Sequence, residues 1–391
     1  MEFPTSPAPV NSVDPTALKA RIDGGEPVTI LDTRPADQYE TWQIQGETVT
    51  SHNVPYTAFQ GGTVEEAIAD VLPTDRTVTA VCAIGRSSEY VAGVLADHGY
   101  DVEHLADGMA GWARLYETVE ITGYGGPGRV WQYQRPSSGC LGYLVVDGDE
   151  AAVVDPLRVF TDRYLADAAE HDAELVRAVD THVHADHISG VRALAAAGVE
   201  GVVPAPATDR GLADTDRLTL LADGDRLEVG GLGIEAVHTP GHTSEMTSLS
   251  VGDELLLTGD GLFLDSVARP DLEAGDDGAP DAARQLHDSL HERLLDRPDR
   301  VLVCPGHHSG TTDAAADGSY TARLEQVRGL DVLSLSREVF VETVLSAMPP
   351  RPANYQRIIA TNLGQRETDD EEAFTLELGP NNCAVSGSTA D

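Results

Sequence analysis

The sequence THVHADHISG at residues 181–190 decides the fold, because it places metal-binding side chains at the end of an apolar, strand-like run, LVRAVD. His182 and His184 are two residues apart, so in extended backbone both project to the same side and can bind one ion. Asp186 and His187 follow where the chain turns, and they can face a second ion. Imidazoles and carboxylates buried without partners are costly, so this stretch cannot be core filler. It predicts a metal site at a strand end.

Three further segments place polar side chains directly after predicted strands. HTPGHTSE contains His238 and His242, ELLLTGD ends on Asp260, and VLVCPGHHSG contains His307 and His308. These side chains are further candidate ligands. Four loops at strand ends thus supply nitrogen and oxygen ligands without thiolate, a set that suits zinc, iron or manganese.

The chain is long enough for two domains with full hydrophobic cores. In the first, strand-like runs alternate with helical periods, including a helix predicted at residues 64–72, and this alternation indicates a parallel α/β sheet. In the second, strand-rich halves with helices outside suggest an α/β sandwich; a helix predicted at 280–296 has Leu286, Leu290 and Leu294 on one face. The acidic tail is expected to be weakly ordered. The predicted boundaries are an extension at 1–20, a first domain at 21–120, a second at 129–364 and the tail at 365–391.

Acidic residues dominate the charge balance. Asp and Glu total 65 against 26 Lys and Arg, the formal net charge is −39, and Lys19 is the only lysine. The acids are spread along the whole chain, so we interpret them as adaptation to a salt-rich, halophilic cytoplasm in preference to an acidic partner-binding patch. Nucleic acid is not an expected partner, since its binding requires a basic protein surface.

The sequence shows no signal peptide and no run of 18 apolar residues, so we expect a cytoplasmic protein without membrane contact.

The order HVHADH, GHT, GD and GH resembles that of the metallo-β-lactamase superfamily over roughly residues 129–364. The resemblance implies an αβ/βα sandwich with the metals at the edge between the two sheets. It also implies two metal positions and makes Asp186 a catalytic candidate. The first position is held by His182, His184 and His242, the second by Asp186, His187 and His307, and Asp260 is shared.

Two reactions within this superfamily fit the motifs. A hydrolase uses two metals about 3.5–4 Å apart to bridge a hydroxide, whereas an oxygenase binds one ferrous ion through two His and one carboxylate. The segment GDGLFLDSVARPDL and the ending PPRPANYQRIIATNLG resemble the persulfide dioxygenase family, which oxidises thiol persulfides to sulfite with O₂. This resemblance assigns one Fe²⁺ to His182, His242 and Asp260 and places Arg269 near the substrate, although Arg269 could equally be a structural ion-pair partner.

The alternative is a glyoxalase II type enzyme, which hydrolyses thioesters with two Zn²⁺ per chain. The longer helical C-terminal domain of that family is not evident in this sequence, but the metal ligands themselves do not decide between the two. The expected partner is therefore a small thiol persulfide or a thioester. The oligomeric state stays open, with a symmetric homodimer as the common default.

The first domain contains LDTRPADQYETWQIQG, CAIGRSS and DGMAGW, which resemble a rhodanese domain, a sulfur-transfer module. The resemblance makes Cys82 the sulfur carrier, at a strand end where a loop leads into a helix, and places Arg86 at the substrate. Rhodanese loops usually have arginine five residues after the cysteine, where this chain has Ser87, so an inactive docking domain is the alternative. We hypothesise that Cys82 transfers sulfane sulfur to a small thiol and that the metal site oxidises the resulting persulfide.

The remaining cysteines are Cys140, Cys304 and Cys383, and they have no comparable sequence context. Disulfides are not expected.

Overall fold

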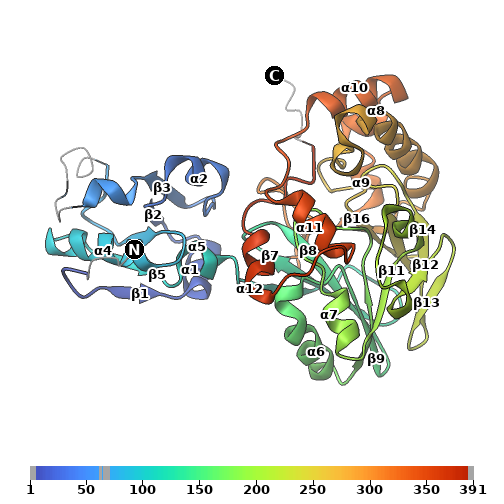
Figure 1. The fold of residues 1–391 in the computed structure, drawn as a ribbon, viewed down its shortest axis with the longest axis horizontal. Helices are drawn as coiled ribbons and strands as arrows, with labels where there is room; N and C mark the ends of the chain where they lie inside the picture. The colour runs from blue at the N-terminus through green and yellow to red at the C-terminus, as the bar shows by residue number, and fades with distance from the viewer. Residues whose placement is uncertain (1–5, 61–63, 65–70, 386–391) are drawn as a thin grey trace. The chain divides into compact units, whose positions relative to one another are not determined.

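A computed structural model of the chain describes residues 6–60, 64 and 71–385 (Figure 1). The helix predicted at 64–72 falls almost entirely outside the described residues. The chain divides into two compact units, which are described separately: Met1–Tyr116 with Arg135–Ser138, and Glu117–Gln134 with Gly139–Asp391.

The first unit is built on a five-stranded sheet in the order β1-β5-β4-β2-β3, and every pair of neighbours is parallel. All five residues of the strand β2, VTILD, are buried, as expected for a parallel strand covered on both faces. Its strands are β1 (Asn11–Val13), β2 (Val28–Asp32), β3 (Val49–Asn53), β4 (Val78–Val81) and β5 (Val102–Leu105). Its helices are α1 (Pro15–Asp23), α2 (Ala36–Thr41), η1 (Tyr56–Phe59), α4 (Arg86–Asp97) and α5 (Gly108–Trp112).

The second unit contains two sheets. The seven-stranded sheet has the order β12-β11-β10-β9-β8-β7-β6, and the six-stranded sheet runs from β13 to β18 in sequence order. The first sheet comprises β6 (Glu117–Glu120), β7 (Arg129–Arg135), β8 (Cys140–Asp147), β9 (Glu150–Val154), β10 (Glu174–Val179), β11 (Glu200–Pro204) and β12 (Thr219–Leu221). The second comprises β13 (Arg226–Val229), β14 (Leu232–His238), β15 (Thr247–Val251), β16 (Leu255–Gly259), β17 (Leu302–Pro305) and β18 (Ala322–Arg323).

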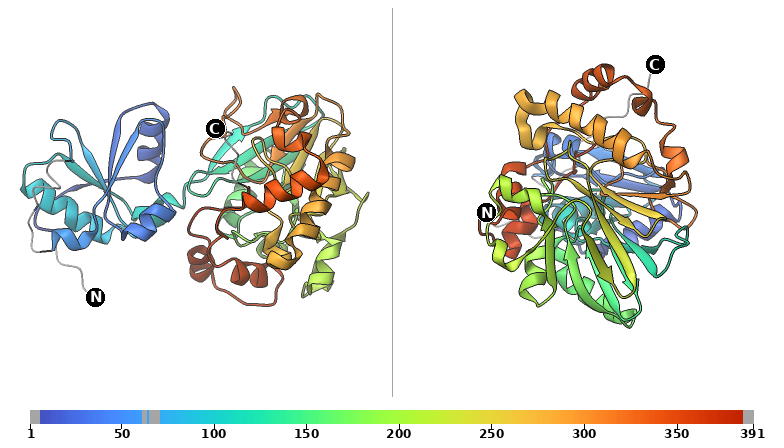
Figure 2. Two further views of the ribbon diagram at one scale, coloured as in Figure 1. Left: turned by 90° about the horizontal axis from the view of Figure 1, so that it is seen from above. Right: turned by 90° about the vertical axis from the view of Figure 1, so that its right-hand side faces the viewer.

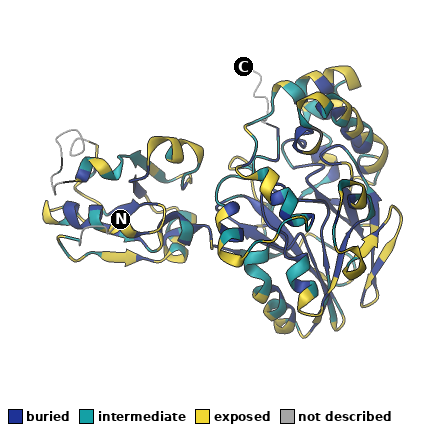
Figure 3. Ribbon diagram, viewed as in Figure 1, coloured by how far each residue is buried: buried dark blue, intermediate teal, exposed yellow. Residues whose placement is uncertain are grey.

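Apolar side chains from both sheets of the second unit form one core between them. Tyr143 and Val179 of the first sheet belong to the same buried cluster as Ile234 and Leu257 of the second. The strands are accordingly buried, while the exposed residues concentrate on the helices and loops (Figure 3). In the right-hand view of Figure 2 the two sheets, coloured green and yellow, lie between helices. The expected architecture, a parallel α/β domain followed by an αβ/βα sandwich, is confirmed.

The helices of the second unit pack around its sheets and around the loops that leave them. They are α6 (Thr161–Glu170), α7 (Val191–Ala196), α8 (Asp271–Ser289), α9 (Leu324–Val327), α10 (Arg337–Ser346), α11 (Tyr355–Asn362) and α12 (Asp370–Leu376). Short 3₁₀ turns lie at Arg158–Phe160, Ala205–Arg210, Thr215–Arg217 and Asp331–Ser334. Helix α8 starts earlier than predicted, contains a kink at Gly275, and continues into a π-helical turn at Leu290–Leu294. Its predicted apolar face is buried, with Leu286, Leu290 and Leu294 in one cluster. Within the part of the chain that the structure describes, no helix has the length and apolarity needed to cross a bilayer.

The acidic tail differs from the expectation of weak order. Helix α12 buries Ala373, Phe374 and Leu376, and Cys383 is fully buried in the core beside the second sheet. The backbone N–H of Val385 donates to the carbonyl of Val267. The described part of the tail is ordered because a few apolar residues, spaced among many acidic ones, occupy buried positions. The average composition of the tail, which is polar and acidic, does not reveal these apolar residues.

Candidate metal centre

The loops that carry the predicted ligands leave the strands at one edge of the sandwich. Strands β14 and β15 are antiparallel, β15 and β16 are antiparallel, and β16 and β17 are parallel. Strands β14, β16 and β17 therefore all run in the same direction, and their carboxyl ends meet at one edge. The loop after β10, in the other sheet, reaches this edge, because the N–H of Thr247 donates to the carbonyl of Thr181 over 2.9 Å.

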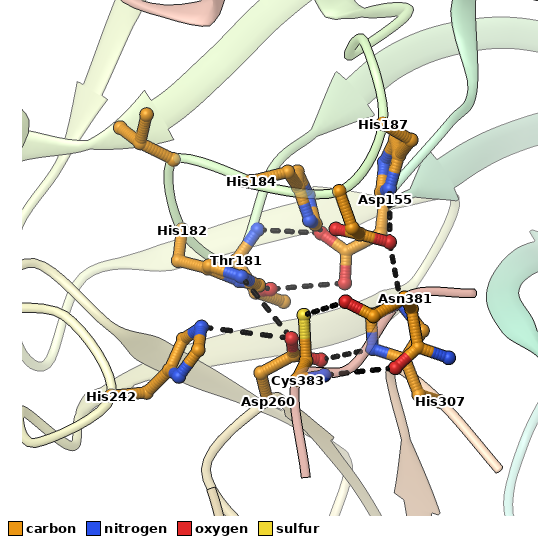
Figure 4. A network of polar contacts seen from close by, with 12 residues as sticks. Asp155, Thr181, His182, His184, His187, His242, Asp260, His307, Asn381 and Cys383 are labelled. Atoms are coloured by element: carbon orange, nitrogen blue, oxygen red, sulfur yellow. Dashed lines mark hydrogen bonds and ion pairs between the residues drawn. The ribbon is translucent and has the colours of Figure 1, made fainter. Parts of the chain in front are cut away.

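The structure brings all seven predicted ligands together in a buried cluster, shown in part in Figure 4. His182, His242 and Asp260 form one group, in which one ligand atom from each lies within 4.8 Å of the others. Asp186, His187 and His307 form a second such group together with Cys140, and His184 groups with Asp155 and Asp180. The His184 ring lies 4.2 Å from the His182 ring, so His184 also borders the first group.

Hydrogen bonds fix the orientation of the two rings in the first group and of the neighbouring His184 ring. The hydroxyl of Thr181 donates to the Asp155 carboxylate (2.9 Å), so its oxygen is left to accept from Nδ1–H of His182 (3.0 Å). Nε2–H of His184 donates to the same carboxylate over 3.2 Å, and Nδ1–H of His242 donates to the carbonyl of Arg269 over 2.8 Å. In each imidazole one nitrogen is used as a donor, so the other presents a lone pair. Such outer hydrogen bonds are typical of metal-bound histidine.

The ligand atoms that form no hydrogen bond are the ones that would coordinate a metal. Buried polar atoms almost always have partners, so several unpartnered ones in one place require an explanation. Six atoms of the predicted ligands are buried without a hydrogen-bond partner among the described residues: His182 Nε2, His184 Nδ1, Asp186 Oδ1, His187 Nε2, His242 Nε2 and Asp260 Oδ2. A donor set of imidazole nitrogens and carboxylate oxygens fits zinc, iron or manganese. The residues therefore fit a metal centre.

The protonation states of the first group suit metal binding. Burial lowers the pKa of His182 well below its ordinary value, and burial likewise lowers the pKa of His242. Burial opposes ionisation of Asp260, but His307 outweighs it and holds the pKa of this carboxyl below its usual range. Two neutral imidazoles and one carboxylate are the forms that coordinate an ion.

Arg269, predicted near the substrate, is fully buried beside this group. Its guanidinium donates to both carboxylate oxygens of Asp271 (2.7 and 3.1 Å) and to the carbonyls of Pro350 (2.9 Å) and Asn382 (3.0 Å). Because its carbonyl also accepts from His242, these contacts support the structural alternative, in which Arg269 fixes the ligand through its backbone. Contact with substrate stays a prediction.

Asn362, the last residue of α11, hydrogen-bonds the HVHADH loop and holds its backbone in place. Its side-chain amide donates to the carbonyls of His184 and His187, each over 2.9 Å, and its oxygen accepts from the N–H of Ser189 over 2.9 Å. One residue from the C-terminal segment thus holds the loop on both sides of Asp186. We interpret Asn362 as a positioning residue.

Replacing Asn362 by alanine is expected to weaken Zn²⁺ binding about 10–100-fold, the range typical of residues that orient metal ligands. Competition with a chromogenic chelator measures this. Gln365→Ala is the matched control, because the Gln365 amide also donates to two carbonyls, those of Arg210 and Gly211, but touches no ligand loop. Equal Zn²⁺ affinity in both variants and the parent would contradict the role.

In the first unit, Cys82 lies where the sequence predicts a sulfur-transfer loop. It follows β4, and Gly85 with φ of 80° turns the chain into helix α4. The Ser88 hydroxyl lies 3.3 Å from the Cys82 sulfur, and the N–H of Met109 donates to the Cys82 carbonyl. Arg86, predicted at the substrate, is exposed in the first turn of α4. The Cys82 side chain is itself buried, and its role as the sulfur carrier stays a prediction.

Sequence reasoning missed four residues of the centre. Asp155 could have been recognised from the sequence, because it ends a predicted strand. No sequence pattern marks Cys140, Asn362 and Cys383, since tertiary contacts alone bring them to the centre. Cys383 lies with Asp260 and His307 in a further group of potential ligands.

Comparisons with known proteins agree with this geometry. The family model for the metallo-beta-lactamase superfamily matches residues 137–307, and that for the rhodanese-like domain matches 14–115. The chain is 28% identical over 257 residues to the mitochondrial persulfide dioxygenase ETHE1 of Bos taurus, which covers 62% of this chain and 90% of the relative. It is 33% identical over 220 residues to the hydroxyacylglutathione hydrolase of Xylella fastidiosa, covering 52% and 79%. The crystal structure of ETHE1 from Myxococcus xanthus matches with a TM-score of 0.50 and 30% identity, covering 60% of this chain and 98% of that one.

Proposed function

Since this chain is an enzyme of the metallo-beta-lactamase superfamily with an N-terminal rhodanese-like domain, we propose that it oxidises low-molecular-weight thiol persulfides to sulfite with O₂, using one Fe²⁺. The reaction is RSSH + O₂ + H₂O → RSH + SO₃²⁻ + 2H⁺, in which the terminal sulfur is oxidised and O₂ is reduced. The proposal makes the protein an enzyme of sulfur metabolism.

The observation that carries the proposal is the grouping of His182, His242 and Asp260. Two imidazoles and one carboxylate that converge from three loops match the facial triad of non-haem iron oxygenases, which leaves coordination positions open. The bound Fe²⁺ would supply the redox chemistry with O₂. The persulfide dioxygenase ETHE1 of Bos taurus and the ETHE1 of Myxococcus xanthus, to which this chain is similar, support the same assignment.

The residues around the triad hold it in one arrangement. Asp155 and Thr181 orient His182 and His184, and the Arg269 carbonyl orients His242. All of these side chains are buried, so the hydrogen bonds that orient the ligands are shielded from competition with bulk water.

The rhodanese-like domain supplies a source for the substrate. With thiosulfate as donor, the Cys82 thiolate would take the outer sulfur and release sulfite, which leaves Cys82 as a persulfide. A small thiol would then take that sulfur, regenerate the Cys82 thiolate and leave as RSSH. This product is the substrate proposed for the metal centre.

Oxygen consumption tests the proposal directly. Iron-reconstituted protein given glutathione persulfide in molar KCl is expected to consume one O₂ for each sulfite formed. Protein reconstituted with Zn²⁺ is the control, and we expect it to consume none. A folded, iron-loaded chain that consumes no O₂ with several thiol persulfides would overturn the proposal.

The second candidate is hydrolysis of a thioester by two Zn²⁺. The specific observation in its favour is the group of Asp186, His187 and His307, because a mononuclear oxygenase does not require it. The hydroxyacylglutathione hydrolase relative supports it as well. Release of thiol from S-lactoylglutathione by the zinc-loaded protein, without O₂, is the result expected of this reaction alone.

A further inference from the structure

We propose that Cys140 is a metal ligand, and that with Asp186, His187 and His307 it forms a position for a thiophilic ion such as Zn²⁺. The chain then has two metal positions of different chemistry, one with nitrogen and oxygen donors and one with a thiolate in addition. This inference goes beyond the proposed function and holds whether the first position oxidises persulfides or hydrolyses thioesters.

The backbone fixes Cys140 opposite a predicted ligand. Cys140 and His307 form an isolated antiparallel β-bridge that joins the start of β8 to the loop that follows β17. The N–H of Leu141 donates to the carbonyl of Gly306 over 2.8 Å, and the N–H of His308 donates to the carbonyl of Gly139 over 3.0 Å. The two side chains are thus held together by the main chain on both sides of the pair.

Gly139 is the residue that permits this approach. Its φ is 78°, in the left-handed region that other residues rarely adopt, and a Cβ built on it would clash with the carbonyl oxygen of His308. A glycine placed directly before the cysteine therefore lets β8 lie against the strand end that carries His307.

The side chains around Cys140 complete a donor set. Its sulfur lies 3.2 Å from Oδ2 of Asp186, and one ligand atom of each of the four residues lies within 4.8 Å of the others. All four residues are buried, and Oδ1 of Asp186 and Nε2 of His187 have no hydrogen-bond partner among the described residues. Two imidazoles, a carboxylate and a thiolate make the four ligands of a tetrahedral zinc site.

Cys304 shows what a purely structural thiol looks like in the same chain. It is equally buried, but it lies in the apolar core between the sheets, and burial raises the pKa of its thiol well above the ordinary value. Cys140 instead faces three residues that carry nitrogen and oxygen donors. Burial alone does not distinguish the two cysteines; their polar neighbours do.

Cobalt substitution tests the proposal without any assay of activity. The metal-free full-length chain is titrated with Co²⁺, and the near-ultraviolet charge-transfer band of a thiolate bound to cobalt is recorded. We expect a band corresponding to one thiolate per chain, lost in Cys140→Ser and retained in Cys304→Ser, Cys383→Ser and Cys82→Ser. The Cys383 variant is the stringent control, because Cys383 also lies near Asp260 and His307.

A wild-type chain that binds Co²⁺ to saturation without this band would overturn the proposal, as would a band that survives in Cys140→Ser. If Cys140→Ser does not fold, as judged by near-ultraviolet circular dichroism, X-ray absorption of the zinc-loaded wild-type chain decides. A sulfur neighbour at about 2.3 Å from zinc that persists in Cys82→Ser, Cys304→Ser and Cys383→Ser is expected; nitrogen and oxygen neighbours alone would refute the proposal. These spectra stay informative even if the oxygen-uptake experiment fails.

Discussion

Alanine at His242 or Asp260 is expected to abolish persulfide oxidation, with turnover falling about a thousandfold or more. A metal ion stabilises transition-state charge by several kcal/mol, and about 1.4 kcal/mol corresponds to each factor of ten in rate. Each variant removes one of three protein ligands of the proposed iron triad and leaves its other ligands buried. Oxygen uptake by iron-reconstituted protein, together with bound iron per chain, measures the effect.

His238→Ala is the matched control for these variants, because His238 ends strand β14 just before the loop of His242, and among the described residues its ring hydrogen-bonds only the carbonyl of Ser244. We expect it to stay within about twofold of the parent. Asp260→Asn keeps the volume of the side chain and separates loss of the ligand from loss of packing. If His242→Ala retained iron and full turnover, the assignment of the triad would be wrong.

Serine at Cys82 is expected to remove thiosulfate:thiol sulfur transfer completely and to leave oxidation of added persulfide unchanged. A hydroxyl differs from the thiol by one atom, but it cannot carry sulfane sulfur. The Cys82 side chain sits between β4 and the first turn of α4, where Ser88 contacts its sulfur, so the small serine should fit without disturbing the loop. Sulfur transfer is followed by sulfite release from thiosulfate without O₂, and oxidation by O₂ consumption.

Cys304→Ser is the control for this experiment, because Cys304 lies in the apolar core of the second unit. It should leave both activities intact if the variant folds. Sulfur transfer that persists in Cys82→Ser would show that the domain acts through another group. Loss of both activities in a folded Cys82→Ser variant would contradict the proposed separation of the two reactions.

The metal cluster was predictable because its information is local. Each of the four loops follows an apolar strand and carries its ligands within a few residues, so HVHADH, GHT, GD and GH stand out in the sequence. Strands that run in the same direction end at the same edge, which brings together the three loops of the six-stranded sheet, and the family resemblance implies that the HVHADH loop of the other sheet joins them.

The other residues of the centre are brought there by tertiary contacts, which cannot be read from a single stretch of sequence. Cys140 is the first residue of β8 and reaches His307 only because Gly139 allows the close backbone approach. Asn362 lies on a helix 175 residues beyond the His187 carbonyl it contacts. The same limit explains the tail, where acids dominate the composition and Phe374 and Cys383 are buried.

The six unpartnered ligand atoms have a consequence for the life of the protein in the cell. Without an ion, folding buries them at a cost, and any ion that binds only the folded chain adds stability in proportion to RT ln(1 + [L]/Kd), about 2.7 kcal/mol at a hundredfold excess over Kd. Newly made chains would therefore persist when metal is plentiful and be degraded when it is scarce. Supply of metal would set how much enzyme accumulates as well as how fast each molecule works.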